Sequence, residues 1–136
     1  MEDKIQHFVG KVAQKAIIAT EGKILICRGI GDKVWELPGG RLHAGESPQE
    51  GLAREVLEEL NLVIAVEKPV YLCRSFHFKD NNHQIFVAYR CPVISGEIKA
   101  DRSEVEDMRW VSEKEAFEMP LFDDCRDALK AYFGVR

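Results

Sequence analysis

The chain has 136 residues, of which 46% are hydrophobic and 31% charged, an ordinary balance for one globular domain with room for a core. Its net charge of −4 argues against a basic surface for long nucleic acids. No apolar run is long enough to cross a membrane, and residues 1–10 lack the apolar stretch of a signal peptide. The four cysteines lack the paired spacing of zinc or redox sites. We therefore expect a single cytoplasmic domain over residues 1–136.

Extended segments open the chain and lead into a glycine loop. Residues 9–20 and 23–28 are rich in aliphatic and β-branched side chains, and a turn signal separates them. Residues 34–37 are expected to be short and extended, because Pro38 disfavours helix in the residue before it. The Gly39-Gly40 pair then permits a tight backbone path without Cβ atoms.

A strong helix is predicted from Pro48 to Leu60. Ser47 suits the N-cap and Glu50 stands three residues later, which is the pattern of a capping box with proline at the first helical position. The apolar stripe at i, i+4 and i+8 consists of Leu52, Val56 and Leu60. Asn61 stands at the expected helix end, where asparagine tolerates a left-handed conformation.

Another face of this helix carries three carboxylates, those of Glu55, Glu58 and Glu59. Their i+3 and i+4 spacings make them project together and repel one another. Mg²⁺ prefers oxygen ligands and is often shared between carboxylates and substrate phosphates, so it would turn this repulsion into coordination. The alternative is a solvated helix face, on which Arg54 would pair with Glu58 at i+4.

Shorter elements follow the helix. Strands are expected over residues 62–66, 70–78, 83–94 and, after an acidic loop at 103–107, over residues 109–111. Ser112 and Glu115 have capping-box spacing for a short helical turn. A last helix starts at Asp123 or Asp124, and its inner face consists of Ala128, Leu129 and either Tyr132 or Phe133. This order fits an α/β fold in which a mixed sheet lies between helices.

The segment from Gly40 to Leu62, GRLHAGESPQEGLAREVLEELNL, resembles the Nudix box, G-x5-E-x7-R-E-U-x-E-E-x-G-U, where U is a bulky aliphatic residue. The residues that agree with its specified positions are Gly40, Glu46, Arg54, Glu55, Val56, Glu58, Glu59 and Leu62. Asn61 replaces the last glycine. The resemblance implies a Nudix α/β/α sandwich and a metal-dependent hydrolase of nucleoside diphosphates linked to another group X.

The resemblance also implies roles for individual residues. Glu55 and Glu59 would be the principal ligands of Mg²⁺, for which Mn²⁺ can substitute. Glu58 and the carbonyl of Gly39 would support them. An ion pair of Glu46 with Arg54 would tie the loop to the helix, which makes Glu46, Arg54 and Gly40 structural.

One further acidic ligand is implied from outside the helix, on a loop before a strand resembling R-W-V. Glu104, six residues before Trp110, is the best match, and Glu106 is the second choice. The alternative is a solvated acidic loop. The general base is left open among Glu55, Glu58 and Glu104.

The candidates for substrate contacts are less specific. Arg28 ends a predicted strand and is a candidate phosphate ligand or a surface residue. Trp35, Phe76 and Phe78 are candidates for stacking on a base, although Phe76 and Phe78 share one strand face that fits a core role. Asp123 is a candidate for reading a purine edge, or else a helix N-cap.

The leading functional hypothesis is cleavage of a nucleoside triphosphate to the monophosphate and pyrophosphate. The alternatives are hydrolysis of ADP-ribose, nucleotide sugars or dinucleoside polyphosphates, removal of RNA caps, and a Nudix-fold module that binds nucleotides without turnover. The expected partner is a small nucleotide rather than a long nucleic acid or a membrane. Many family members are dimers, so a homodimer is the default expectation.

Overall fold

The computed structural model describes residues 4–77 and 79–135, so the predicted stacking residue Phe78 lies outside the described part. The strands are β1 (Lys11–Ile17), β2 (Ala19–Thr20), β3 (Lys23–Gly29), β4 (Gly39–Arg41), β5 (Val63–Ile64), β6 (Pro69–His77), β7 (Asn82–Arg90), β8 (Val93–Ser95) and β9 (Val105–Val111). The helices are α1 (Pro48–Leu60), α2 (Glu113–Glu118) and α3 (Asp123–Phe133). Among these described helices, none has the length and apolar character needed to span a membrane.

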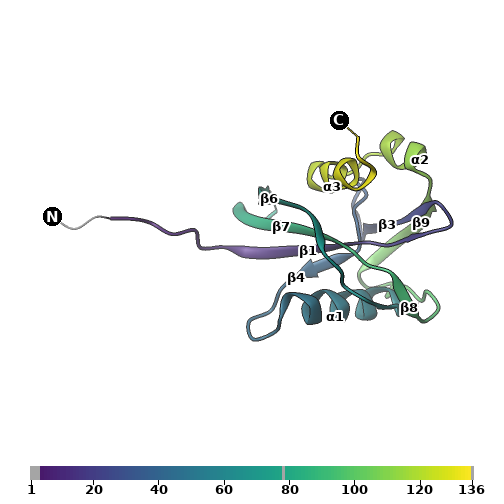
Figure 1. The fold of residues 1–136 in the computed structure, drawn as a ribbon, viewed down its shortest axis with the longest axis horizontal. Coiled ribbons are helices and arrows are strands. Elements are labelled where there is room, and N and C mark those ends of the chain that lie inside the picture. The colour runs from purple at the N-terminus through teal and green to yellow at the C-terminus, as the bar shows by residue number, and fades with distance from the viewer. Residues whose placement is uncertain (1–3, 78, 136) are drawn as a thin grey trace.

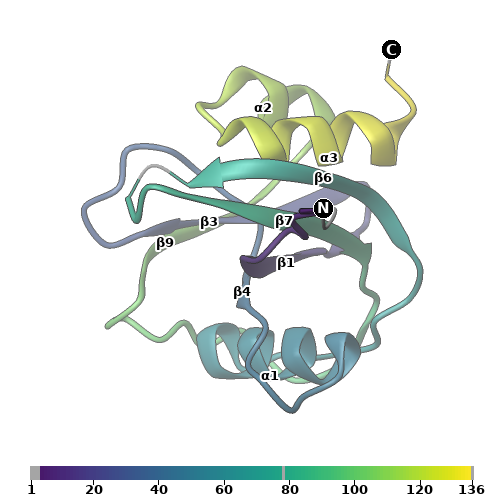
Figure 2. The ribbon, with the colours of Figure 1, turned by 90° about the vertical axis from the view of Figure 1, so that its left-hand side faces the viewer.

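The strands form a layer between helices. Figure 2 shows α1 on one side of this layer and α2 with α3 on the other, which confirms the predicted α/β/α sandwich. The largest sheet has the order β4-β1-β7-β6, and it is mixed because β1 pairs with β7 in parallel and with β4 antiparallel. A second sheet has the order β2-β3-β9, and β5 pairs with β8. The first described residues extend away from this body (Figure 1).

Each helix layer has its own hydrophobic core. The predicted stripe Leu52, Val56 and Leu60 of α1 is fully buried and packs with Ile18 and Leu25. On the opposite side of the sheets, α3 contributes a second cluster, which contains Cys125, Ala128 and Leu129 with strand residues such as Ile17 and Phe86. The sheets are therefore packed against helices on both faces.

The predicted helix caps are largely present. The Ser47 hydroxyl accepts a hydrogen bond from the Glu50 N–H at 3.2 Å, which is one half of the predicted capping box. Both halves are present at α2, between Ser112 and Glu115. Asn61 ends α1 in the left-handed conformation with φ 59°, and its side chain also donates to a neighbouring loop carbonyl. Its replacement of glycine is thus accommodated.

Two predicted strand boundaries and one predicted helix cap are wrong. The acidic segment 103–107 is not all loop, because β9 already begins at the buried Val105 and its backbone pairs with β3. The segment 83–94 is two strands, since Pro92 lies between β7 and β8 and has no N–H for a ladder. Helix α3 begins at Asp123, as predicted, but its N-cap is Phe122, which forms no side-chain cap hydrogen bond, so Asp123 is not the N-cap.

Candidate functional site

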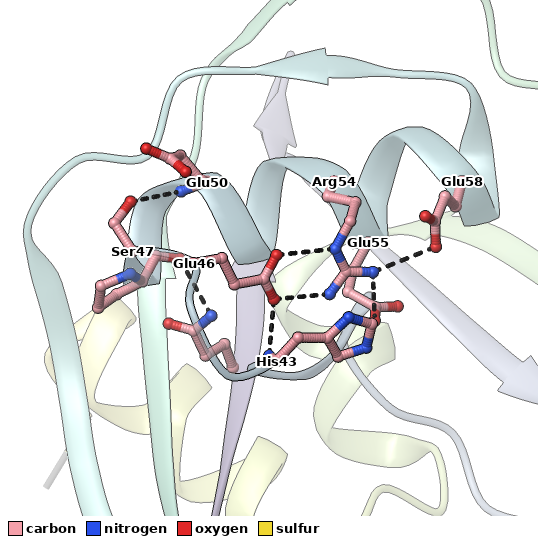
Figure 3. Close-up of polar contacts among 9 residues, drawn as sticks. His43, Glu46, Ser47, Glu50, Arg54, Glu55 and Glu58 are labelled. Atoms are coloured by element: carbon pink, nitrogen blue, oxygen red, sulfur yellow. Dashed lines mark hydrogen bonds and ion pairs between the residues drawn. The ribbon is translucent and has the colours of Figure 1, made fainter.

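The loop before α1 is fastened to the helix by an ion pair (Figure 3). Arg54 donates from Nε to Glu46 Oε2 at 2.9 Å and from Nη2 to Glu46 Oε1 at 2.8 Å. The same carboxylate accepts the His43 N–H at 2.7 Å. Arg54 and this backbone N–H lower the pKa of Glu46 to about 2. The pair that the sequence predicts is therefore present, and Glu46 is fully engaged in holding the loop.

Arg54 also binds two of the three predicted ligands on the same helix. Its Nη1 lies 3.0 Å from Glu55 Oε1 and 3.3 Å from Glu58 Oε2, as Figure 3 shows. Glu55 keeps only 16% of its side-chain surface exposed, whereas Glu58 exposes 58%. Glu55 thus faces the sheet, and Glu58 lies at the rim.

Glu59 lies against the glycine loop. Its Oε1 accepts the Gly39 N–H at 3.1 Å. Burial raises the pKa of Glu59 to about 7, although Lys15 and the Gly39 N–H oppose this effect. A carboxylate held in this way is mostly desolvated, and the free energy for its ionisation must come from nearby positive groups.

The two glycines of the loop are required by close contacts. A Cβ on Gly39 would lie 2.0 Å from the backbone oxygen of Gln14, and the φ of Gly39 is +142°. A Cβ on Gly40 would lie 2.5 Å from the carboxyl carbon of Glu55. The glycine pair therefore brings β4 directly against β1 on one side and against a box carboxylate on the other.

These residues offer a donor set that fits a hard divalent cation. Glu55, Glu58 and Glu59 supply carboxylate oxygens on one helix, and the glycine loop that would supply a carbonyl is in contact with it. Within residues 4–77 and 79–135, however, no group of three or more His, Cys, Asp or Glu side chains converges on one point. Glu55 and Glu58 instead share Arg54 as a partner, and Glu59 accepts the Gly39 N–H.

The two candidates outside the box lie at the start of β9. Glu104 is exposed, and its backbone N–H donates to Asp101. The Asp101 N–H in turn donates to the Glu59 carbonyl at 2.8 Å, which fastens this loop to the end of α1. Within the described part of the chain, no hydrogen bond or ion pair joins the Glu104 side chain to the box. Glu106 forms an ion pair with Arg28 instead.

A cleft of about 520 Å³ opens beside the box. Its lining includes Lys15, Glu36, Gly40, Arg41, Ser75, Phe76, Gln84, Phe86, Phe122, Asp123 and Asp124. Gly40 belongs to this lining and contacts Glu55, so the cleft runs from the box carboxylates toward the start of α3. If a cation is bound to the carboxylates, this end of the cleft can receive an anionic group, while the aromatic side chains of the lining can contact a flat ring.

The structure separates the predicted substrate residues into two groups. Phe76 and Asp123 both line the cleft. Trp35 is only 6% exposed and belongs to the core, with the guanidinium groups of Arg28 and Arg109 over its ring, so the stacking prediction for Trp35 is wrong. Arg28 does not line the cleft, because it binds the Asp32 carbonyl at 2.8 Å and Glu106.

Sequence reasoning missed an ion pair in this cleft. Lys15 Nζ lies 2.5 Å from Glu36 Oε1, and both residues line the cleft. A signal was available, since Lys15 stands between Ala13 and Ile17, and residues two apart on a strand share a face. Both neighbours are core residues. A charged residue on a buried strand face indicates a special environment.

Comparisons with known proteins agree with this geometry. Residues 11–132 match the model of the NUDIX domain. A Bacillus subtilis (strain 168) protein whose name proposes an 8-oxo-dGTP diphosphatase is 34% identical over 89 residues, which are 65% of this chain and 55% of that protein. This chain therefore spans little more than half the length of that relative.

Two other relatives match over most of their length. The CTP pyrophosphohydrolase of Escherichia coli (strain K12) is 29% identical over 127 residues, which cover 89% of this chain and 90% of that protein. The solution structure of the E. coli ORF135 protein superposes with a TM-score of 0.78 at 26% identity, covering 93% of this chain and 90% of that one.

Proposed function

Because the chain belongs to the NUDIX domain family, we propose that it is a divalent-metal-dependent hydrolase that cleaves a nucleoside triphosphate to the monophosphate and pyrophosphate. The observation that carries the proposal is the contact between the box and the cleft. Carboxylates on α1 border one end of the cleft through Gly40, and aromatic side chains line it elsewhere. Pyrophosphohydrolase names among the relatives support the same reaction class.

The proposed metal is Mg²⁺, with Mn²⁺ as a substitute. Glu55, Glu58 and Glu59, with the Gly39 carbonyl, would hold it, and Glu104 would approach from the loop fastened to the end of α1. When bound, such a metal neutralises charge on the phosphates and lowers the pKa of a water molecule.

The remaining parts of the mechanism belong to the chain. Arg54 fixes the rotamers of Glu55 and Glu58, and through Glu46 it holds the loop that leads into α1. One carboxylate, from Glu55, Glu58 or Glu104, accepts the proton of the attacking water. The cleft then orients the nucleotide, because most of the rate gain in phosphoryl transfer comes from positioning and electrostatics.

A Nudix-fold module that binds without turnover is the competing function from another class. Retention of all three box carboxylates supports the enzyme instead, since a binding module has no need of three repelling glutamates on one helix.

The test is release of phosphate from a panel of substrates with Mg²⁺ or Mn²⁺ and a coupling pyrophosphatase or phosphatase. The panel contains nucleoside triphosphates, dinucleoside polyphosphates, ADP-ribose, nucleotide sugars and capped RNA ends. We expect metal-dependent turnover of nucleoside triphosphates, with the Glu55→Gln/Glu59→Gln double variant, purified identically, as the control for contaminants. Turnover confined to another class would replace the substrate assignment, and silence across the panel with both metals would contradict the enzyme.

A further inference from the structure

The cleft contains a charged pair of which neither member is a proposed metal ligand. Lys15 on β1 and Glu36 before the glycine loop form an ion pair of 2.5 Å between Nζ and Oε1. Only 13% of the Lys15 side chain and 25% of the Glu36 side chain stay exposed, and both line the cleft. The pair is therefore largely shielded from bulk water, and the surface that it still exposes faces the cleft.

The fold does not depend on this pair to join the two segments. The Ala16 N–H already donates to the Pro38 carbonyl at 2.8 Å, and Cys27 and Glu36 exchange two backbone hydrogen bonds. Desolvating two charges is costly, and apolar residues in place of a buried ion pair are often neutral or stabilising. An ion pair at this position is thus better explained by what it offers to a ligand than by what it adds to stability.

The ion pair with Glu36 favours the ammonium form of Lys15. Burial by itself would lower the pKa of Lys15, but Glu36, Cys125 and Glu59 together outweigh burial, so the pKa of Lys15 lies above its ordinary value. Oε1 of Glu36 is engaged by Lys15, so the pair presents the remaining N–H groups of an ammonium beside the second oxygen of a carboxylate. It is a donor-only group fixed next to an acceptor-only group.

The four common bases differ in how they match such a pair. On guanine, the acceptors N7 and O6 are contiguous and stand next to the donors N1–H and N2–H₂. On cytosine, the donor N4–H₂ stands next to the contiguous acceptors N3 and O2. Adenine presents acceptor, donor and acceptor in alternation, and so does uracil. A fixed ammonium beside a fixed carboxylate complements the first two edges, because lysine favours guanine O6 and N7 and carboxylates accept from cytosine N4.

We propose that Lys15 and Glu36 select the base, favouring guanine and cytosine nucleotides over adenine and uracil nucleotides. The inference rests on the proposed function in one respect, that the cleft receives a nucleotide. Phe76 and Phe122 line the same cleft and expose 38% and 41% of their surface, which provides apolar faces for a flat ring.

The first experiment measures binding, so that it does not depend on turnover. Calorimetric titration with nucleoside monophosphates compares dGMP with dAMP, which are matched in size, and dCMP with dUMP, which differ mainly in the edge of the base. We expect the wild-type protein to bind dGMP and dCMP about tenfold more tightly or better. Equal affinity for the members of each pair would overturn the proposal.

Two variants assign the preference to the pair. In Lys15→Met/Glu36→Gln we expect each affinity ratio to fall to about twofold or less, because no charge is left to distinguish the edges. Glu36→Gln alone keeps a side chain of the same shape, and its amide can donate as well as accept, so both ratios should also fall. The matched control is Arg90→Met/Glu67→Gln, an exposed pair of 3.5 Å outside the cleft lining, which should leave the ratios unchanged.

Circular dichroism separates folding from recognition. If the double variant does not fold, Glu36→Gln decides the question alone. A folded variant that keeps the wild-type ratios would overturn the proposal. Base preference in binding without hydrolysis of any triphosphate would contradict the proposed enzyme and support this inference, whereas hydrolysis of all triphosphates with unselective binding would do the reverse.

Discussion

Glu59 is partly buried beside the glycine loop. Removing its charge is therefore the most direct single-residue test of the metal-ligand assignment. Glu59→Gln retains an oxygen that can accept the Gly39 N–H, so the fold should persist. We expect kcat/KM to fall by about 10²–10³-fold, the usual effect of removing one group that stabilises developing charge. Steady-state kinetics with circular dichroism measure this, and Glu50→Gln at the exposed start of the same helix is the control. Near-wild-type turnover in a folded variant would refute the ligand assignment.

Substitution by alanine should have different effects at Gly39 and at Gly40. Gly39→Ala places a Cβ 2.0 Å from the backbone oxygen of Gln14 at a φ of +142°. Relief of this clash requires movement of the backbone, which is costly. We expect a loss of about 2–4 kcal/mol in the free energy of unfolding. Gly40→Ala meets only the end of the Glu55 side chain, which can rotate away. It should lower kcat far more than stability, and denaturant unfolding beside kinetics of both variants tests the contrast. Equal destabilisation would contradict it.

The residues of the site differ in how well the sequence predicts them. Glu46 and Arg54 are eight positions apart, so their pairing depends on a loop and two helical turns, and the Nudix box pattern indicates it. Lys15 and Glu36 lie on separate segments with no shared motif, and their contact exists only once β1 lies beside the glycine loop. Trp35 shows the converse, because an aromatic residue near a cleft gives the same sequence signal whether it lines the cleft or fills the core.

Among the elements, the loop before α1 depends on a single carboxylate. Arg54 and the His43 N–H lower the pKa of Glu46 from 4.5 to about 2. A carboxyl group with a lowered folded-state pKa stabilises the fold above its unfolded pKa and loses that effect as the pH falls toward the folded value. Glu46→Gln should therefore lower Tm at pH 7, and the gap to wild type should narrow between about pH 4.5 and pH 2. Thermal unfolding across this range measures it, and a gap independent of pH would contradict the role.

Element prediction succeeded where local signals were strong. Helix α1 has its cap, its proline, its apolar stripe and its left-handed end within one continuous segment, and its predicted bounds are those observed. The predicted start of β9 is wrong because the acidic residues Glu104, Glu106 and Asp107 are typical of a loop, whereas pairing with β3 makes the segment a strand. The predicted N-cap of α3 is wrong because no capping side chain starts this helix. Phe122 takes the N-cap position directly after the β-bridge between Trp35 and Leu121.

For the whole molecule, the site lies where two layers meet across the sheet. The box carboxylates belong to α1, whereas Asp123 and Asp124 belong to α3 on the other side, and the cleft joins the two through β1, β4 and the β6-β7 pair. The sequence order predicts the sandwich, but it does not predict the cleft, which depends on how far each strand extends past its neighbours. Substrate contacts are therefore harder to predict than the proposed metal ligands, which lie in or directly beside one motif apart from Glu104.

A metal that binds only the folded chain must stabilise the whole domain. At a Mg²⁺ concentration of 100 times Kd, linkage raises the free energy of unfolding by about 2.7 kcal/mol, which for a domain of this size raises Tm by roughly 10 °C. We expect this shift in thermal unfolding of the wild-type protein, and a much smaller one in Glu55→Gln/Glu59→Gln, which lacks two of the three ligand carboxylates. The same double variant should also start from a higher Tm without metal, because fewer carboxylates repel one another on α1. Glu50→Gln is the control. It also removes one negative charge from α1, but Glu50 is not one of the three box carboxylates, so the wild-type Tm shift should remain. A wild-type Tm that responds to neither Mg²⁺ nor Mn²⁺ would contradict a metal site on α1, whatever activity the protein shows.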